Sequence, residues 1–194
     1  MNIYRALSFI IGICFTQLVI AKDADYVIDE SHFSLGFLVE HAGYAKTLGM
    51  FKKVNGSFIY DQDKKLLSNV EIFIDTSSVF TNHEKRDAHL RSPDFLDVER
   101  FPVMTFKAKH NDLNKNPGKI TGRLTLLGIS REIILNTTVN KIKEYPFGFT
   151  KPIVMGVSAT ASFNRSDFGM DYAVGENGVG NQIDLIIEFE AIKQ

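Results

Sequence analysis

The sequence IDLIIEFE, from residue 183 to residue 190, decides the class of fold. Apolar side chains occupy every second position of it, at Ile183, Leu185, Ile187 and Phe189. Acidic residues separate most of them. Because the side chains of a strand point alternately to its two faces, this spacing predicts a β-strand with one buried and one exposed face.

Seven earlier segments show the same period of two, and most are separated by short turn sequences such as residues 61–64 and 128–130. Their inward-facing positions include Phe33, Leu35, Phe37 and Val39, then Val54, Phe58 and Tyr60, then Val70, Ile72 and Ile74, then Met104 and Phe106. Further along they include Ile120, Leu124 and Leu126, then Ile133, Leu135 and Val139, and finally Val157 and Phe163. About eight antiparallel strands joined in this way predict an up-and-down barrel or a sandwich.

Residues 81–106, TNHEKRDAHLRSPDFLDVERFPVMTF, interrupt the strands with the one segment that has helical signals. Thr81 and Glu84 have the spacing of a capping box, which predicts that a helix begins there. Asp87 stands four residues after a histidine and four before an arginine, a spacing at which side chains on a helix can pair. From this pairing alone, the simplest interpretation is a solvated, ion-paired helix inserted between two strands.

The first 21 residues have the composition of a secretory signal peptide. Arg5 precedes an apolar run from residue 6 to residue 20, and Ala21 offers a site for cleavage before Lys22. This run is shorter than the roughly 20 apolar residues that a membrane span requires. We therefore expect residues 1–21 to be removed on export, with an uncleaved anchor as the alternative.

Cleavage would leave residues 22–194 as one domain without cysteine, because Cys14 is the only one in the chain. An exported protein without disulfides is typical of a bacterial periplasm, where we expect this one. The remaining 21 basic and 23 acidic residues give a net charge near −2. This balance provides no electrostatic argument for binding nucleic acid or an anionic membrane surface.

The sequence contains no motif of an enzyme or of a metal site. Its five histidines are not spaced with cysteines or carboxylates as zinc ligands are, and no glycine-rich phosphate loop precedes a helix. No nucleophile elbow of the form G-x-S-x-G is present either. We expect no metal, no cofactor and no catalysis. A catalytic alternative would require His41, Arg86, Asp87 and His89 to converge at a barrel mouth.

Four segments, in this order along the chain, resemble motifs of the YceI family of bacterial periplasmic proteins. They are YVIDESHFSLGFLVEHAGYAKTLGMF at residues 26–51, RDAHLRSPDFLDVERFPVMTF at 86–106, GRLTLLGISREI at 122–133 and FNRSDFGMDY at 163–172. The resemblance extends from residue 26 to residue 193. Phe33 departs from the pattern, because the family more often has serine after the histidine; the departure does not affect the expected fold.

The resemblance implies an all-β fold: an eight-stranded antiparallel lipocalin-like up-and-down barrel with a short helical insert. It also implies an exported binding protein that holds a polyisoprenoid lipid, such as a polyprenyl lipid or an isoprenoid quinone, in an apolar tunnel. Together with the period of two, it assigns the tunnel lining to Phe33, Leu35, Phe37, Val39, Phe58, Ile72, Ile74, Met104, Phe106, Leu124, Leu126, Phe163, Leu185 and Ile187. Candidates for contact with the lipid head group at the mouth are His41, Arg86 and His89.

The residues alone leave open whether the barrel is hollow, because a filled core and a lined cavity both need inward-facing phenylalanines. Close packing favours the filled core. A filled barrel without a lipid ligand would serve instead as a stress-response or protein-interaction module. In the same way, His41 could be a core histidine, and Arg86 could hold Asp87 or the loop beneath it.

Overall fold

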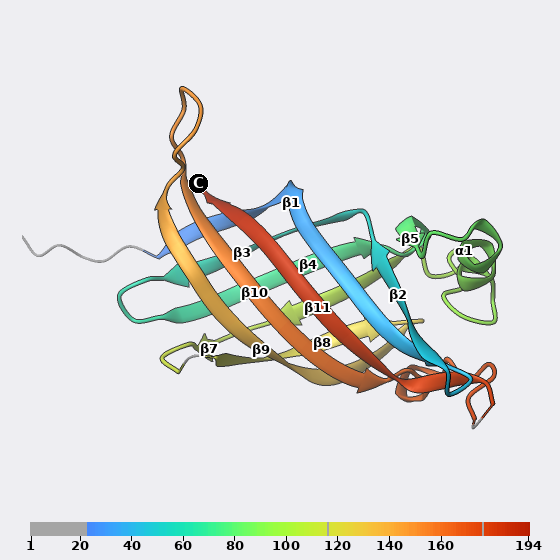
Figure 1. The fold of residues 1–194 in the computed structure, drawn as a ribbon. Coiled ribbons are helices and arrows are strands. Elements are labelled where there is room, and N and C mark those ends of the chain that lie inside the picture. Colours follow the sequence, from blue (N-terminus) through green and yellow to red (C-terminus); the bar gives the residue numbers. More distant parts are fainter. Residues whose placement is uncertain (1–22, 116, 176) are drawn as a thin grey trace, which may run out of the picture.

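The computed structural model describes residues 23–115, 117–175 and 177–194, most of which form a closed antiparallel β-barrel (Figure 1). The strands are β1 (Ala24–His41), β2 (Ala45–Phe51), β3 (Val54–Asp61), β4 (Leu66–Asp75), β5 (Val79–Phe80), β6 (Val103–Ala108), β7 (Asn111–Asp112), β8 (Gly118–Leu126), β9 (Ile129–Glu144), β10 (Ile153–Asn164) and β11 (Val179–Lys193). The short helices are η1 (Thr76–Ser78), α1 (Glu84–Arg91) and η2 (Arg165–Phe168). Within these described ranges, no helix has the length and apolar character of a membrane span. The expected signal peptide lies outside them.

The eleven strands form a barrel wall of eight lines. Three of these lines each consist of two consecutive strands. β1 pairs with β2 over residues 35–41 and with β3 over residues 24–27, so β2 and β3 form a single line beside it. In the same way β5 extends β4, and β7 extends β6. β11 pairs with β1, with Phe33 opposite Phe189, and closes the barrel. The predicted eight-stranded antiparallel up-and-down barrel is confirmed.

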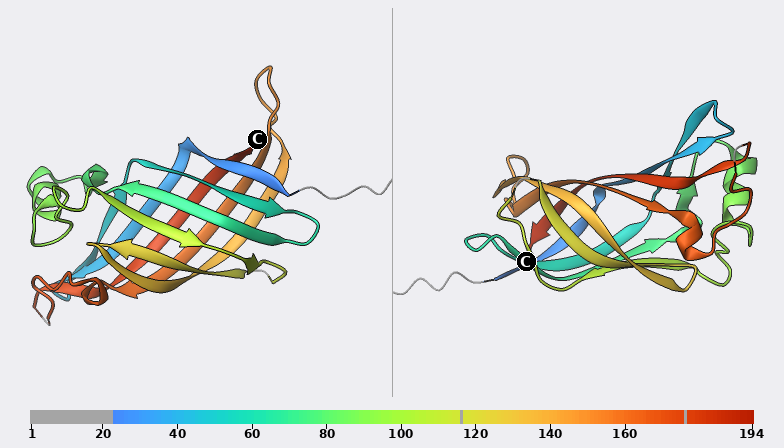
Figure 2. Two further views of the ribbon diagram at one scale, coloured as in Figure 1. Left: turned by 180° about the vertical axis from the view of Figure 1, so that it is seen from behind. Right: turned by 90° about the horizontal axis from the view of Figure 1, so that it is seen from below.

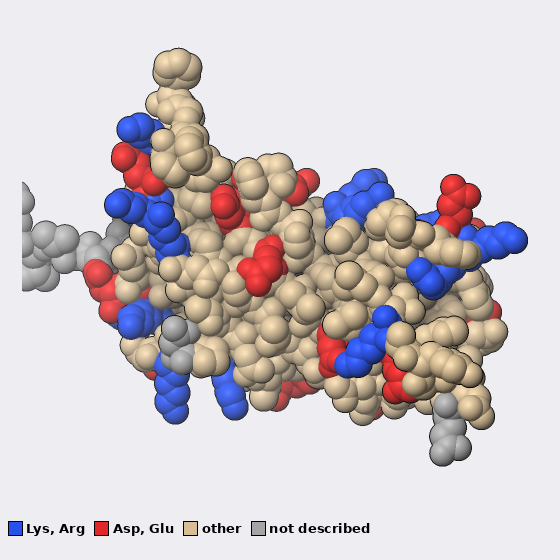
Figure 3. All heavy atoms as spheres, viewed as in Figure 1, with Lys and Arg blue, Asp and Glu red and all other residues tan. Residues whose placement is uncertain are grey.

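Alternation along the strands separates an apolar interior from a mixed exterior. β8, for example, is buried at every second residue from Gly118 to Leu126. Large rings fit inside because glycines face them: a Cβ atom at Gly49 would overlap the ring of Phe37, and one at Gly122 would overlap the ring of Phe106. Charged side chains lie scattered over the outer surface (Figure 3). The period of two in the sequence therefore corresponds to the inside and the outside of the barrel.

The insert between β5 and β6 contains the expected helix, but the predicted capping box is wrong. α1 begins after His83, whose Nδ1 accepts a hydrogen bond from the Arg86 backbone N–H at 3.2 Å. Thr81 instead donates both its backbone N–H and its hydroxyl to Asp87. Within the described residues, Asp87 makes no ion pair with His83 or Arg91, because its buried carboxylate is turned toward Thr81. A buried acceptor therefore ties α1 to the chain before it.

The two ends of the barrel carry different connections (Figures 1 and 2). α1, the β1–β2 turn and the β10–β11 connection lie at one end. The C-terminus and the β9–β10 hairpin lie at the other end, where the hairpin projects from the wall. Phe95 and Leu96, which follow α1, are buried in the core. The insert therefore contributes apolar side chains to one end of the interior.

Candidate ligand cavity

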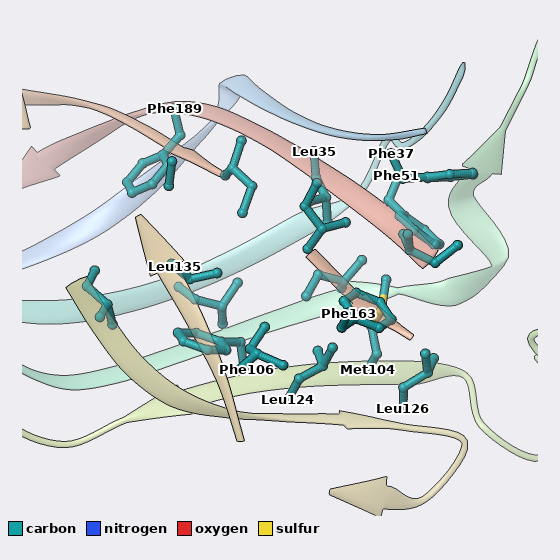
Figure 4. Close-up of a pocket in the computed structure, with 18 of the residues that line it drawn as sticks. Leu35, Phe37, Phe51, Met104, Phe106, Leu124, Leu126, Leu135, Phe163 and Phe189 are labelled. Atoms are coloured by element: carbon teal, nitrogen blue, oxygen red, sulfur yellow. The ribbon is translucent and has the colours of Figure 1, made fainter. Parts of the chain in front are cut away.

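The barrel is hollow and encloses a cavity of about 200 Å³. Its wall contains residues from all eight lines of strand, and Leu90, Phe95 and Leu96 of the insert extend it toward the α1 end. Figure 4 shows part of this wall. Among the described residues that line it, only Thr137 and Arg165 have polar side chains. Interiors of folded proteins contain few voids larger than a water molecule, so an apolar space of this size is unusual for a filled core. The interior is therefore a lined cavity.

All fourteen residues predicted for the tunnel lie on this wall. They come from β1, β3, β4, β6, β8, β10 and β11, in each case from the inward-facing side of the strand. Figure 4 shows Leu35, Phe37, Met104, Phe106 and Phe163 directed into the same space. Their contact with a lipid stays a prediction.

Aromatic rings from β1, β3 and β11 stack on one another in one section of the interior. Phe33 stacks on Phe189 with ring centroids 5.9 Å apart, and Phe189 meets the edge of Phe58 at 6.3 Å. Phe58 in turn stacks on Tyr26, which is almost fully buried. Burial raises the pKa of the Tyr26 hydroxyl above its ordinary value. This stack places flat, apolar surfaces around one section of the interior.

At the α1 end, the insert and the β10–β11 connection meet through three rings. The ring centroid of His89 lies 5.0 Å from that of Phe95 and 5.1 Å from that of Tyr172. The centroids of Phe95 and Tyr172 are 5.3 Å apart, and all three pairs are edge-to-face. His89 belongs to α1, whereas Tyr172 belongs to the connection between β10 and β11. These contacts join two segments that are far apart in sequence across one end of the cavity.

Arg165 is the charged residue on the described cavity wall, and only 1% of it is exposed. Its Nε donates to the carbonyl of Gly180 and its Nη1 to that of Met170, both at 2.8 Å. Its Nη2 donates to the carbonyls of Tyr172 and Val179, both at 2.9 Å. Burial lowers the pKa of the guanidinium from its ordinary value. The side chain thus holds both ends of the β10–β11 connection against the barrel.

Sequence reasoning missed Arg165, although it lies in the quoted segment FNRSDFGMDY. Its position in the alternating pattern could have identified it: Arg165 stands two residues after the inward-facing Phe163, so it falls on the same, inward face of the strand. A charged residue at an inward position costs several kcal/mol unless it is well satisfied, so its position alone pointed to a special role. No described carboxylate lies within ion-pair distance of it, and backbone carbonyls take that place.

The three residues predicted to hold a head group at the mouth lie at the α1 end of the barrel but not on the cavity wall. His41 is exposed at the end of β1, which contradicts its alternative interpretation as a core histidine. Arg86 donates to the hydroxyl and the carbonyl of Thr81, each at 2.7 Å, and so holds the loop before α1. His89 Nε2 lies 2.8 Å from Asp94 Oδ2. None of the three lines the described cavity, and their contact with a head group at the mouth stays a prediction.

Outside the barrel, Asp29, His32 and Glu190 bring one potential metal-ligating atom each within 4.8 Å of the others. His32 Nδ1 lies 2.8 Å from Asp29 Oδ2. This hydrogen bond raises the pKa of His32 and lowers the pKa of Asp29. The hydrogen bond accounts for the closeness of two of the three groups without a metal ion.

The fold and the cavity define the class of protein: a lipocalin-like hollow barrel, whose eight strands enclose a space wide enough for one small ligand. Within that class the chain belongs to the YceI family, since the model of the YceI-like domain matches residues 26–191. The family predicted from the four sequence motifs is confirmed.

Curated relatives and solved structures agree with this assignment. A UPF0312 protein of Pseudomonas savastanoi pv. phaseolicola is 34% identical over 177 residues, covering 90% of this chain and 89% of the relative. The Campylobacter jejuni YCEI protein superimposes with a TM-score of 0.71 at 28% identity, over 80% of this chain and 90% of that one. A polyisoprenoid binding domain from Saccharophagus degradans shares the fold, with a TM-score of 0.59 at 12% identity over 89% of this chain and 100% of its own.

Proposed function

We propose that the protein binds a polyisoprenoid lipid, such as a polyprenyl lipid or an isoprenoid quinone, with the tail inside the barrel. The observation that carries this proposal is the composition of the cavity wall, which is apolar apart from Thr137 and Arg165. Burying apolar surface is favourable by roughly 25 cal/mol per Å², so a tail needs few directional contacts. The similar domain of Saccharophagus degradans, described as polyisoprenoid binding, supports the same ligand class.

The shape of the site favours a tail threaded along the barrel axis. Its lining runs from Leu113, near one end of the wall, to Leu90 of α1 at the other. The volume of about 200 Å³ lies below the roughly 300–1,000 Å³ of pockets for drug-sized ligands, so a long tail must displace wall side chains. Met104 and Met155 are flexible enough to do so.

A binding role fits the chemistry of the wall better than catalysis. Covalent catalysis needs a nucleophile within hydrogen-bond reach of a base, and the described wall offers only the hydroxyl of Thr137 and the guanidinium of Arg165. We propose that the protein acts without chemistry, in transport, storage or protection under stress. We further propose that it does so in the periplasm, after removal of residues 1–21. The cavity argues against the alternative of a filled interaction module.

Native mass spectrometry of the full chain, purified gently and then mixed with geranylgeraniol, tests the proposal. We expect a stoichiometric adduct, either carried through purification or formed with the added prenol. Ala159→Phe places a ring in the cavity and should abolish the adduct, because Ala159 lies on the wall. Thr160→Phe is the matched control, since Thr160 faces outward on the same strand. A protein that takes up neither endogenous lipid nor geranylgeraniol, or equal uptake by the two variants, would contradict tail binding in the barrel.

A further inference from the structure

The connection between β9 and β10 carries two phenylalanines whose side chains are largely exposed to solvent. Phe149 is 108% exposed and Phe147 is 72% exposed. They lie at the tip of the hairpin that projects from the barrel at the end opposite α1 (Figure 1). Folded proteins place most phenylalanines inside, so two at one projecting tip require an explanation.

The hairpin holds this tip on an ordered base. β9 and β10 stay paired up to Glu144 opposite Ile153, and the Tyr145 backbone N–H donates to the Pro152 carbonyl at 2.8 Å. The ring of Tyr145 packs edge-on against Phe147 with centroids 5.9 Å apart. The apolar tip is therefore presented by a paired β-ribbon.

Three lysines lie on the two arms of the hairpin below the tip. Lys141, Lys143 and Lys151 are exposed, and Glu144 is the only acidic residue between residues 141 and 153. Three lysines and one glutamate give this segment a net charge of +2, although the charge of the whole chain is close to zero. In Figure 3 the projecting tip carries no charged side chains, and charged groups begin below it.

An aromatic tip above three exposed lysines matches the chemistry of a bilayer surface. Phenylalanine rings enter the boundary between head groups and acyl chains, while lysines stay among anionic head groups. A protein partner is a poorer fit, because a stable interface buries about 800 Å² on each side and two aromatic side chains supply only about 300–500 Å² of that. We propose that the tip, residues 147–149, docks the protein onto membranes that contain anionic lipid.

This proposal goes beyond the lipid cavity and is independent of it, because neither Phe147 nor Phe149 lines the cavity. Tip docking and tail binding can therefore fail separately. Variants of the tip should leave the prenol adduct unchanged, and Ala159→Phe should leave docking unchanged.

The absence of tryptophan from the chain allows a direct test. Phe149→Trp places a single fluorophore at the tip, and Tyr44→Trp places one at an equally open position, 92% exposed, in the β1–β2 turn at the opposite end. The probes are vesicles of phosphatidylcholine alone and of phosphatidylcholine with phosphatidylglycerol in equal parts. We expect the emission of Phe149→Trp to shift to shorter wavelength with the mixed vesicles, and that of Tyr44→Trp to stay unchanged.

Sedimentation with the same vesicles gives a second readout. Phe147→Ser with Phe149→Ser should lower the bound fraction at least tenfold, whereas Tyr44→Ser should not change it. Replacing Lys141, Lys143 and Lys151 by Gln should reduce binding to mixed vesicles to the level seen with phosphatidylcholine alone. No binding by the unaltered protein, an equal shift of both tryptophan probes, or full binding by the double serine variant would overturn the proposal. A protein partner at the tip would produce the first of these results.

Discussion

The guanidinium Nη1 of Arg165 donates to the carbonyl of Met170 at 2.8 Å, and through such bonds a buried cation holds a surface connection in place. The same side chain also donates to the carbonyl of Tyr172 in the β10–β11 connection and to those of Val179 and Gly180, the first two residues of β11. Each end of that connection is thus fixed by one residue of η2.

Arg165→Met should destabilise the protein strongly. The variant leaves four carbonyls, in one buried and three part-buried hydrogen bonds, without their donor. Bonds from charged donors contribute about 1.5–3 kcal/mol each, so we expect a loss of at least about 3 kcal/mol. Urea unfolding followed by circular dichroism measures it. Arg123→Met is the matched control, because Arg123 is exposed on β8 and should change stability by less than about 0.5 kcal/mol. Equal midpoints for the two variants would show that Arg165 is not a structural tie.

Asp87→Ala and Glu84→Ala distinguish the observed helix start from the predicted capping box. Asp87 is buried and accepts two hydrogen bonds from Thr81, so its loss should cost about 1–3 kcal/mol. Glu84 is exposed and should contribute less than about 0.5 kcal/mol. Unfolding midpoints in urea measure both. A larger loss of stability in Glu84→Ala than in Asp87→Ala would instead support the capping box between Thr81 and Glu84.

Gly49→Ala should disturb the interior, because its Cβ would overlap the ring of Phe37. Overpacking of this kind costs about 1–3 kcal/mol. Gly156→Ala is the control, since its Cβ would have Asn140 at an ordinary 3.9 Å. Adding Phe37→Leu to Gly49→Ala should recover part of the stability, as measured by thermal unfolding. A double variant no more stable than Gly49→Ala would mean that the two side chains do not compete for space.

Asp184 should contribute to the stability of the protein against acid. Lys46 Nζ lies 2.6 Å from its carboxylate, and Gln182 and Ser162 also donate to it, which lowers the pKa of Asp184 to about 2. An unfolded aspartate titrates near 3.9, so the ionised group stabilises the fold above about pH 4. That contribution is lost as pH falls through about 2.

The corresponding measurement compares the unaltered protein with Asp184→Asn in urea over a series of pH values. The difference in unfolding free energy should be constant near neutral pH and shrink between about pH 4 and pH 2. Asp63→Asn serves as the control for general acid denaturation. A difference that does not change with pH would exclude the ion pair with Lys46 as its cause.

Much of the barrel was predictable because a strand has only two faces. Each apolar position in residues 183–190 could face only the interior or the solvent, so the period of two also identified the wall residues, from Phe33 to Ile187. The start of α1 was not predictable in this way. Thr81 had two carboxylates within reach, Glu84 and Asp87, and burial of the second one decided between them.

The sequence by itself determined the strands, their inward faces and, through its motifs, the family. Tertiary structure decided what local spacing does not encode. Pairing of β11 with β1 fixes the radius of the barrel, and that radius leaves the inward side chains short of filling the space between them. The tertiary structure also brings Arg165 within hydrogen-bond distance of backbone carbonyls up to 15 residues away in sequence. These bonds compensate for the burial of its charge. His41 has the same parity as Phe37, yet it lies at the end of the barrel, where an inward direction reaches solvent.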